Sequence, residues 1–242
     1  MLAHVVSVLR QVVDEVVVVS SADLELPALD VRLVVDRVPG LGPLAGIRDG
    51  LAEITAELAY VTSVDSPLLT PHFVRTMLAF GKAAAPVVDG HVQTLAAVYP
   101  RSALAAAEDL LVAQRMRPLF LLEAAGYRRV TEAELPQERA WRGFNTPEEY
   151  LIAVREAFGE TTARLELVGL ARVAMGCEAL DVPVGTLAEV LAVTRPALEL
   201  LDGDRVAPPF LVSLDGRDFV RDARVPIGPG ERAIVIDAQA GG

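Results

Sequence analysis

The chain has 242 residues, of which 52% are hydrophobic and 23% charged, and its formal net charge is −11. This composition indicates a globular protein of one or two domains, while the acidic balance argues against a nucleic-acid partner and no apolar run approaches the ~20 residues of a membrane span. The N-terminus has no secretory pattern and Cys177 is the only cysteine, so we expect a cytoplasmic protein without intrachain disulfides.

The first part of the chain alternates short β-branched runs with helical stretches. Strands are expected at residues 16–19, 31–35, 59–63, 86–88 and 95–99. Helices are expected at residues 2–13, 47–57, 71–80 and 103–111. Apolar strands that alternate with helices indicate a sheet covered on both faces, so we predict an α/β domain with a Rossmann-like, doubly wound and mostly parallel sheet.

A helix boundary marks the end of this domain. Thr146 is a suitable N-cap, Pro147 suits the first helical position and Glu149 completes a capping box. The helix should extend to residue 158, where Gly159 ends it. We therefore predict a first domain at residues 1–158, a linker at 159–163 and a second domain at 164–242.

The second domain has a different order of elements. Strands are expected at residues 165–170, 179–184, 210–214, 218–220 and 233–237. Thr186 and Glu189 form a second capping box that begins a helix ending near Thr194, and Asp215-Gly216 suits a hairpin turn. This order of strands around one helix predicts a β-grasp (ubiquitin-like) fold.

The last strand is followed by a tail that finishes with Gly241-Gly242. Glycine lacks a Cβ, so such a tail can pass through a narrow channel into the nucleotide site of another enzyme. A frayed chain end is the alternative interpretation of the same residues. The β-grasp pattern before the tail favours a carrier whose terminal carboxylate is activated.

This domain resembles the small subunit of molybdopterin synthase, a sulfur carrier. The resemblance is carried by residues 165–167, 185–191, 212–216 and 227–231 and by the terminal glycines. It implies that Gly242 is adenylated and converted to a thiocarboxylate, while Gly241 supplies the reach. The implied partners are an activating (adenylating) enzyme and the large synthase subunit. The sulfur carrier of thiamine synthesis has the same fold and tail, so the β-grasp pattern alone does not choose the pathway.

The first domain resembles the molybdenum cofactor guanylyltransferases, which are nucleotidyltransferases. Three stretches carry the likeness: Asp36 with the Gly-Pro-Leu-Ala-Gly loop at 42–46, the strand with Asp65-Ser66-Pro67, and Asn-Thr-Pro-Glu-Glu at 145–149. The resemblance points both domains to molybdenum cofactor synthesis. It implies GTP and Mg²⁺ as cofactors and molybdopterin as the acceptor.

Five residues are candidates for the nucleotide site. Asp65 follows a predicted strand, where open α/β sheets bind ligands, and could hold Mg²⁺ against phosphates or cap a helix. By resemblance Asp36 contacts the nucleotide, although a surface salt bridge is an alternative role. Gly42 and Gly46 allow close backbone approach to a ligand or simply form a turn. Asn145 orients the pterin or the metal, or precedes a helix cap.

The sequence departs from this family at its start. The family begins with a strand and a glycine-rich loop that cradles the triphosphate, followed by a lysine, whereas the first residues here match the helix after that loop. Lys82, the only lysine, is far along the sequence. A domain without this strand exposes unpaired backbone that a partner strand or a dimer would cover. Either the protein begins upstream of Met1 or the loop has been lost.

Three functions follow from these observations. The first is a sulfur carrier fused to a catalytically weak or silent nucleotidyltransferase-like domain. The second is an active GTP-dependent molybdopterin guanylyltransferase with Asp65 as the Mg²⁺ ligand. The third is an adaptor that performs no covalent chemistry. We rank them in this order.

Overall fold

A computed structural model describes residues 1–38, 40–136, 139–159 and 161–237, and its contacts divide the chain into two compact units, Met1–Gly143 and Phe144–Gly242. The helix at residues 147–158, which we expected to close the first domain, is part of the second unit. The two units are described separately.

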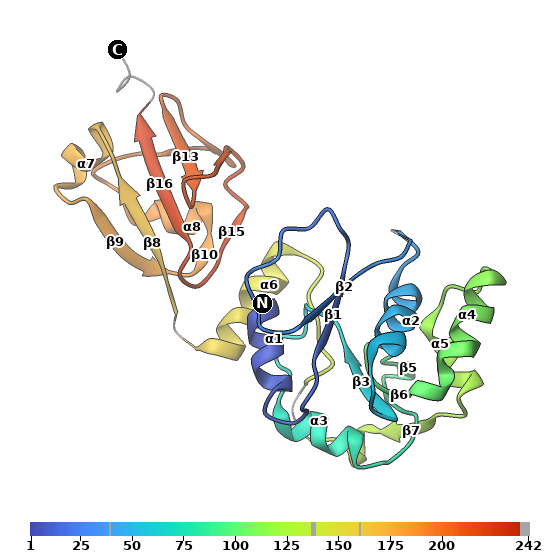
Figure 1. Ribbon diagram of the computed structural model, residues 1–242. Coiled ribbons are helices and arrows are strands. Elements are labelled where there is room, and N and C mark those ends of the chain that lie inside the picture. Colours follow the sequence, from blue (N-terminus) through green and yellow to red (C-terminus); the bar gives the residue numbers. More distant parts are fainter. Residues whose placement is uncertain (39, 137–138, 160, 238–242) are drawn as a thin grey trace. The chain divides into compact units, whose positions relative to one another are not determined.

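The first unit contains helices and strands in alternation (Figure 1). Its helices are α1 (Leu2–Leu9), α2 (Pro43–Glu53), α3 (Pro71–Leu78), α4 (Leu104–Val112) and α5 (Pro118–Ala124). Its strands are β1 (Val17–Ser20), β2 (Arg32–Val35), β3 (Leu58–Thr62), β4 (Ala84–Val88), β5 (His91–Val92), β6 (Ala96–Pro100) and β7 (Arg128–Thr131). The sequence pattern did not predict α5, β5 or β7.

The main sheet of the first unit is mixed, which corrects the expectation of a mostly parallel sheet. β6 pairs antiparallel with both β3 and β4, β5 pairs antiparallel with β4, and only β7 pairs parallel with β4. The chain passes from Val88 to Ala96 through a tight reversal at Asp89 and Gly90, both at positive φ. This connection is shorter than the dozen or so residues that a parallel crossover needs.

Helices cover the two faces of this sheet, as expected for a doubly wound fold (Figure 1). On one face Phe73 and Met77 of α3 and Val5 of α1 form a core with Leu58 and Tyr60. The other face packs on α2, α4 and α5, through residues that include Leu44, Leu51, Ala107 and Leu121 with Ala59 and Val61. Side chains of β3 thus alternate between two cores, as the period of a strand requires.

β1 and β2 form a separate two-stranded parallel sheet. The Thr55 backbone N–H, just before β3, donates to Glu15 Oε2, just before β1, over 3.3 Å. At the same end Arg32 of β2 forms an ion pair with Glu15 at 3.1 Å. The starts of β1, β2 and β3 therefore lie at one end, and their carboxyl ends at the other.

The second unit is made of many short elements. Its helices are α6 (Pro147–Phe158), α7 (Leu170–Met175) and α8 (Leu187–Ala192). Its strands are β8 (Thr162–Leu167), β9 (Ala179–Pro183), β10 (Gly185–Thr186), β11 (Leu201–Asp202), β12 (Arg205–Val206), β13 (Phe210–Leu214), β14 (Asp218–Val220), β15 (Pro226–Ile227) and β16 (Arg232–Asp237). The predicted capping box of Thr186 and Glu189 is present at the start of α8.

The five-stranded sheet of the second unit has the β-grasp order β9-β8-β16-β13-β14. The last strand, β16, lies in the middle, parallel to the first strand β8 and antiparallel to β13 (Figure 1). Leu187, Val190 and Leu191 of α8 are buried in the core on one face of this sheet. Half-buried Cys177 packs against the same core, as small apolar residues do.

Helix α6 packs on β10 and β15 of the second unit. The largest buried side chains of this helix are those of Leu151 and Val154. The Arg155 side chain donates to the Val184 carbonyl at 3.0 Å. Thr146 caps the helix by accepting from the Glu149 N–H at 3.2 Å. The predicted bounds of this helix are confirmed. In the described part of the chain, no helix is long and apolar enough to cross a membrane.

Candidate functional site

Two candidate carboxylates follow the carboxyl ends of strands in the first unit. Asp36 comes directly after β2, and its N–H donates to the Ser20 carbonyl at 2.9 Å, which extends the β1–β2 pairing. Asp65 is half-buried in the turn after β3. Open α/β sheets bind ligands at this edge, so the structure keeps both residues at a suitable place.

Asp65 lies against Gly143, a residue that is distant from it in the sequence. A Cβ built at Gly143 would lie 2.8 Å from Asp65 Oδ2 and 3.1 Å from the Asp65 backbone oxygen. Asp65 Oδ1 is buried and has no hydrogen-bond partner among the described residues. Because a buried acceptor without a donor is costly, this oxygen suits a cation or a donor from a ligand.

The donor set fits Mg²⁺ of the kind that accompanies a nucleotide. Mg²⁺ is usually held by one or two carboxylates together with waters and phosphates. Among the described residues, no group of three or more His, Cys, Asp or Glu side chains could hold a metal by itself. Asp65 could therefore hold Mg²⁺ only when a phosphate group supplies further oxygens.

A cluster of hydroxyl groups holds the turn that carries Asp65. Thr62 Oγ1 donates to Ser66 Oγ at 3.2 Å, and Ser63 Oγ lies 3.2 Å from the same atom. Ser66 is itself buried. Sequence reasoning singled out the Asp-x-Pro motif and missed this cluster, although the Thr-Ser-x-x-Ser spacing was visible.

The loop before α2 depends on Gly42 for its backbone conformation. Gly42 is the N-cap of α2 at φ 79°, a region that side chains disfavour, and Pro43 follows at the first helical position. Gly46 has no positive φ, and a Cβ there would meet no atom within 4 Å. Gly42 is thus required by the turn, whereas Gly46 leaves open space beside α2.

A buried carboxylate that the sequence analysis did not single out connects this loop to α2. Asp49 is 1% exposed, its Oδ2 accepts from the Arg37 N–H at 3.1 Å, and its Oδ1 lies 3.3 Å from Arg37 Nε. Arg48 forms a second ion pair with Asp49. Arg37 directly follows Asp36 in the sequence. The Asp49 carboxylate therefore holds the backbone next to Asp36, the residue expected to contact the nucleotide.

A cavity of about 610 Å³, called here the inter-strand cavity, lies between β1 and β3. Gly46 and Ser63 line it toward the carboxyl ends of the strands, and Glu15 and Thr55 line it toward their starts. Its remaining lining is mostly apolar and comes from α2, β1, β3 and the segment after α1. Of the candidate site residues in the first unit, only Gly46 lines this cavity.

Asn145 lies in the second unit, in the turn before α6. Its backbone N–H donates to Glu149 Oε2 at 2.7 Å. In the predicted capping box the Glu149 side chain would accept from the Thr146 N–H, but here it accepts from the Asn145 N–H instead. This geometry agrees with the alternative that Asn145 precedes a helix cap. Its role toward a pterin or a metal stays a prediction.

The end of β16 is held by a buried carboxylate. Asp237 is 4% exposed, and its Oδ2 accepts from the Leu170 N–H at 2.7 Å. Residues 238–242, with Gly241 and Gly242, lie outside the described residues. The backbone from which the tail departs is therefore fixed to the start of α7.

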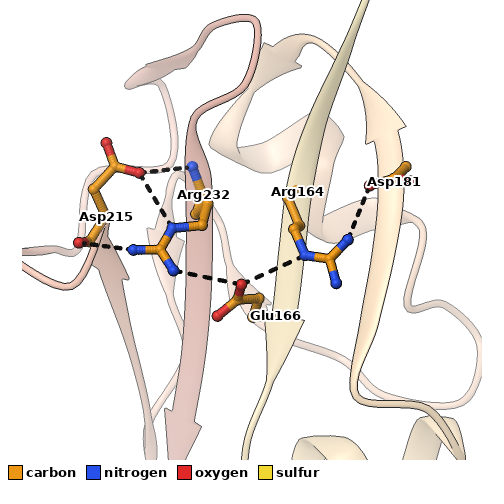
Figure 2. A network of polar contacts seen from close by, with 5 residues as sticks. All are labelled: Arg164, Glu166, Asp181, Asp215 and Arg232. Atoms are coloured by element: carbon orange, nitrogen blue, oxygen red, sulfur yellow. Dashed lines mark hydrogen bonds and ion pairs between the residues drawn. The ribbon is translucent and has the colours of Figure 1, made fainter.

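The sheet face opposite the core of the second unit carries a network of charges (Figure 2). Glu166 on β8 pairs with Arg164 at 3.5 Å and with Arg232 on β16 at 3.6 Å. Arg164 also pairs with Asp181 at 3.4 Å, and Arg232 with Asp215 at 3.7 Å. Exposed ion pairs add little stability, so these contacts make the face polar but contribute little to the stability of the sheet.

Comparisons with known proteins agree with the first unit. The family model described as "MobA-like NTP transferase domain" matches residues 1–130. A protein of Mycobacterium avium (strain 104) named "Probable molybdenum cofactor guanylyltransferase" is 34% identical over 154 residues, which cover 60% of this chain and 76% of that protein. A similarly named protein of Mycobacterium tuberculosis is 36% identical over 139 residues, or 54% of this chain and 69% of that protein.

A crystal structure of a protein from Aquifex aeolicus VF5 has the same fold over 59% of this chain and 77% of that chain, with 22% identity and a TM-score of 0.50. The β-grasp fold of the second unit is given by its own strand order. The matched residues, the identity to the relatives and the mixed sheet covered on both faces lead to one conclusion: the chain belongs to the MobA-like NTP transferase family.

Proposed function

We propose that this protein acts in molybdenum cofactor biosynthesis and that its second unit is a sulfur carrier. The observation that carries the proposal is the position of β16, the central strand of a β-grasp sheet, directly before the tail that finishes with Gly241-Gly242. Asp237 fixes the end of this strand to Leu170. A fixed β-grasp body with a glycine tail can present a carboxylate to another enzyme.

The proposed chemistry takes place on the Gly242 carboxylate. One of its oxygens attacks the α-phosphorus of ATP, which forms an acyl adenylate and releases pyrophosphate. Hydrosulfide, provided by a sulfur donor, then attacks the acyl carbon and AMP leaves, so that a thiocarboxylate remains. Gly241 provides a narrow backbone next to the reacting group. An adenylating enzyme and the large subunit of molybdopterin synthase are the partners that this chemistry needs.

The first unit directs the carrier to the molybdenum cofactor rather than to thiamine. Its relatives include proteins named as molybdenum cofactor guanylyltransferases. A chain that joins such a domain to a sulfur carrier would place two steps of one synthesis in one cytoplasmic protein. The thiamine pathway is the alternative that the following experiment separates.

Removal of Gly242 tests the carrier function. A reconstituted system with activating enzyme, ATP, sulfur donor and large synthase subunit should form molybdopterin with the intact chain and none with the chain that lacks Gly242. Asp65→Asn is the matched control, because a carrier does not need the first unit and should keep its activity. Undiminished molybdopterin formation without Gly242 would contradict the carrier function and favour an adaptor. If the chain delivered sulfur only to the thiazole of thiamine, the carrier would belong to the thiamine pathway.

A second candidate function, GTP-dependent guanylyl transfer to molybdopterin, is supported by Asp65. Its buried Oδ1 has no partner among the described residues and lies at the carboxyl edge of β3, where it could hold Mg²⁺. In this reaction the terminal phosphate of molybdopterin attacks the α-phosphorus of GTP and releases pyrophosphate. Asp36, held next to Arg37 and Asp49, would contact the nucleotide.

Calorimetric titration with GTP and Mg²⁺ tests this second candidate. The intact chain should bind GTP in a Mg²⁺-dependent manner, and Asp65→Asn should remove the Mg²⁺ dependence while the protein keeps its fold. Absence of binding at millimolar GTP would leave the first unit without nucleotidyl transfer, and the sulfur-carrier function would be unaffected.

A further inference from the structure

Two arginines of the first unit share one buried carboxylate. The Asp49 side chain on α2 is fully buried, and its Oδ1 forms ion pairs with Arg37 Nε, at 3.3 Å, and with Arg48 Nε. Its Oδ2 accepts from the Arg37 backbone N–H at 3.1 Å. Two guanidinium groups thus contact one carboxylate, so this cluster keeps one positive charge in excess.

The excess charge is costly if the cluster serves only to hold a loop. The Arg48 side chain is 13% exposed, and its Nη2 is buried without a hydrogen-bond partner among the described residues. Burying a guanidinium costs free energy that a shared carboxylate offsets only in part. Arg37 and its backbone N–H would be enough to hold the Asp49 carboxylate. The second arginine therefore indicates that the cluster receives a further anion.

The Arg37 guanidinium is positioned in advance to bind such an anion. Asp49 fixes its Nε and its backbone N–H, whereas Nη1 and Nη2 have no partner among the described residues. The side chain is 53% exposed, so its unpaired end is accessible to a ligand. A guanidinium can bind phosphate through two parallel hydrogen bonds, and a guanidinium that is already held loses less entropy when it does so.

Arg37 lies where a ligand of the sheet would bind. It follows Asp36, whose N–H continues the β1–β2 pairing past the carboxyl end of β2. Open α/β sheets bind ligands at the carboxyl ends of their strands. In the part of the chain that the structure describes, the Asp36 carboxylate forms no ion pair, so direct contact with it does not cancel the charge of Arg37.

We propose that Arg37, held by Asp49, binds a phosphate group of the ligand at this edge, and that Arg48 supplies the second positive charge. Phosphate matches the cluster better than carboxylate does, because it carries up to two negative charges and several acceptor oxygens. The inference rests on the second candidate function, in which the phosphate belongs either to GTP or to molybdopterin. Arg37 is then a binding residue and Asp49 a positioning residue.

Calorimetric titration of the full chain tests the role of Arg37. The probes are GTP with Mg²⁺, guanosine, 6-hydroxymethylpterin monophosphate and inorganic phosphate. Arg37→Gln should weaken binding of a phosphate-bearing probe about tenfold, because two charge-assisted hydrogen bonds are lost, and should not alter binding of guanosine. A loss toward GTP alone assigns the phosphate to the nucleotide, and a loss toward the pterin phosphate alone assigns it to the acceptor.

Arg32 offers a matched control at the other end of β2. Its side chain is 48% exposed, close to the 53% of Arg37, and it forms ion pairs with Glu15 and Glu53. Five residues of extended chain separate Arg32 from Arg37 by about 16 Å, which exceeds the screening length at physiological salt. Arg32→Gln should therefore leave phosphate binding unchanged, and circular dichroism checks that both variants fold.

Asp49→Asn tests whether the carboxylate positions Arg37. It should weaken phosphate binding by the intact chain but cause little further loss in the Arg37→Gln background, because its effect is transmitted through that guanidinium. Additive losses in the double variant would overturn the positioning role of Asp49. Urea unfolding of the same proteins separates these effects from a general loss of stability.

The outcomes distinguish this proposal from the second candidate function. The proposal is overturned if Arg37→Gln binds the phosphate-bearing probes as tightly as the intact chain does, even where the intact chain binds GTP, or if Arg32→Gln weakens them equally. If the intact chain binds none of these probes, both the proposal and the second candidate function fail. Binding of phosphate that depends on Arg37, without binding of GTP, would support the proposal and contradict guanylyl transfer.

Discussion

Gly169 and Asp237 face each other at the point where the last strand of the β-grasp sheet ends. Gly169 has φ 63° and ψ −130°, and a Cβ at this position would collide with the Asp237 carboxylate. The carboxylate takes that space in order to accept from the Leu170 N–H at 2.7 Å. The absence of a side chain at Gly169 thus allows Asp237 to fix the end of β16 to the start of α7.

The first prediction is that Gly169→Ala destabilises the second unit by about 3 kcal/mol, because a side chain adds both backbone strain and a collision. Urea unfolding measures the change. Gly159→Ala is the matched control, since Gly159 has φ 69° and no atom within 4 Å of a built Cβ. It should cost about 1 kcal/mol from strain alone. Equal losses in the two variants would show that the contact with Asp237 contributes nothing.

The second prediction concerns Gly143 and Asp65. Gly143→Ala should displace the Asp65 carboxylate and weaken Mg²⁺-dependent GTP binding about tenfold, which is ~1.4 kcal/mol. In the Asp65→Asn background the same substitution should cause little further loss, because its effect is transmitted through that carboxylate. Calorimetry on the four proteins gives the coupling. Additive losses would separate Gly143 from the function of Asp65.

The third prediction is that α6 belongs energetically to the second unit. A fragment of residues 144–242 should fold cooperatively, and one of residues 161–242 should be less stable by about 3 kcal/mol, since Leu151 and Val154 lose their buried surface. Thermal unfolding compares the two fragments. If the two fragments were equally stable, α6 would not contribute to the second unit, and the domain boundary predicted at residue 158 would be favoured.

The fourth prediction is a pH dependence at Glu134. The Thr131 backbone N–H, the Thr131 hydroxyl and Arg128 all bond this exposed carboxylate and lower its pKa to about 2. Because the folded pKa lies below the unfolded value of about 4.3, the contribution to stability is complete above that value and disappears as the pH falls toward 2. Carboxyl chemical shifts in an NMR titration should show this low pKa. Thr131→Ala should raise it, and an unchanged pKa would exclude the hydroxyl as a cause.

The sequence predicted the elements whose signals are local. The helix at residues 147–158 has its N-cap, its Pro147 and its terminal Gly159, and the structure has the same bounds. The capping box of Thr186 and Glu189 likewise marked the start of α8. The β-branched runs identified β1, β2 and β3 to within a residue or so.

Features that depend on distant pairing were missed. The antiparallel direction of β6 follows from the short connection after Val88, and β7 is a charged, mostly exposed strand without an apolar alternation. The contact of Gly143 with Asp65 and the ion pair of buried Asp49 with half-exposed Arg37 join residues that no local pattern connects. The sequence could thus name the candidate carboxylates, but only the fold shows what holds them.

The central claim is that Gly242 carries sulfur, and the mass of the intact protein tests it most directly. After incubation with the activating enzyme, ATP and a sulfur donor, the mass should rise by the difference between one sulfur and one oxygen, and fragmentation should place the change at Gly242. An unchanged mass, in a reaction where the same enzyme converts its own carrier, would contradict the account.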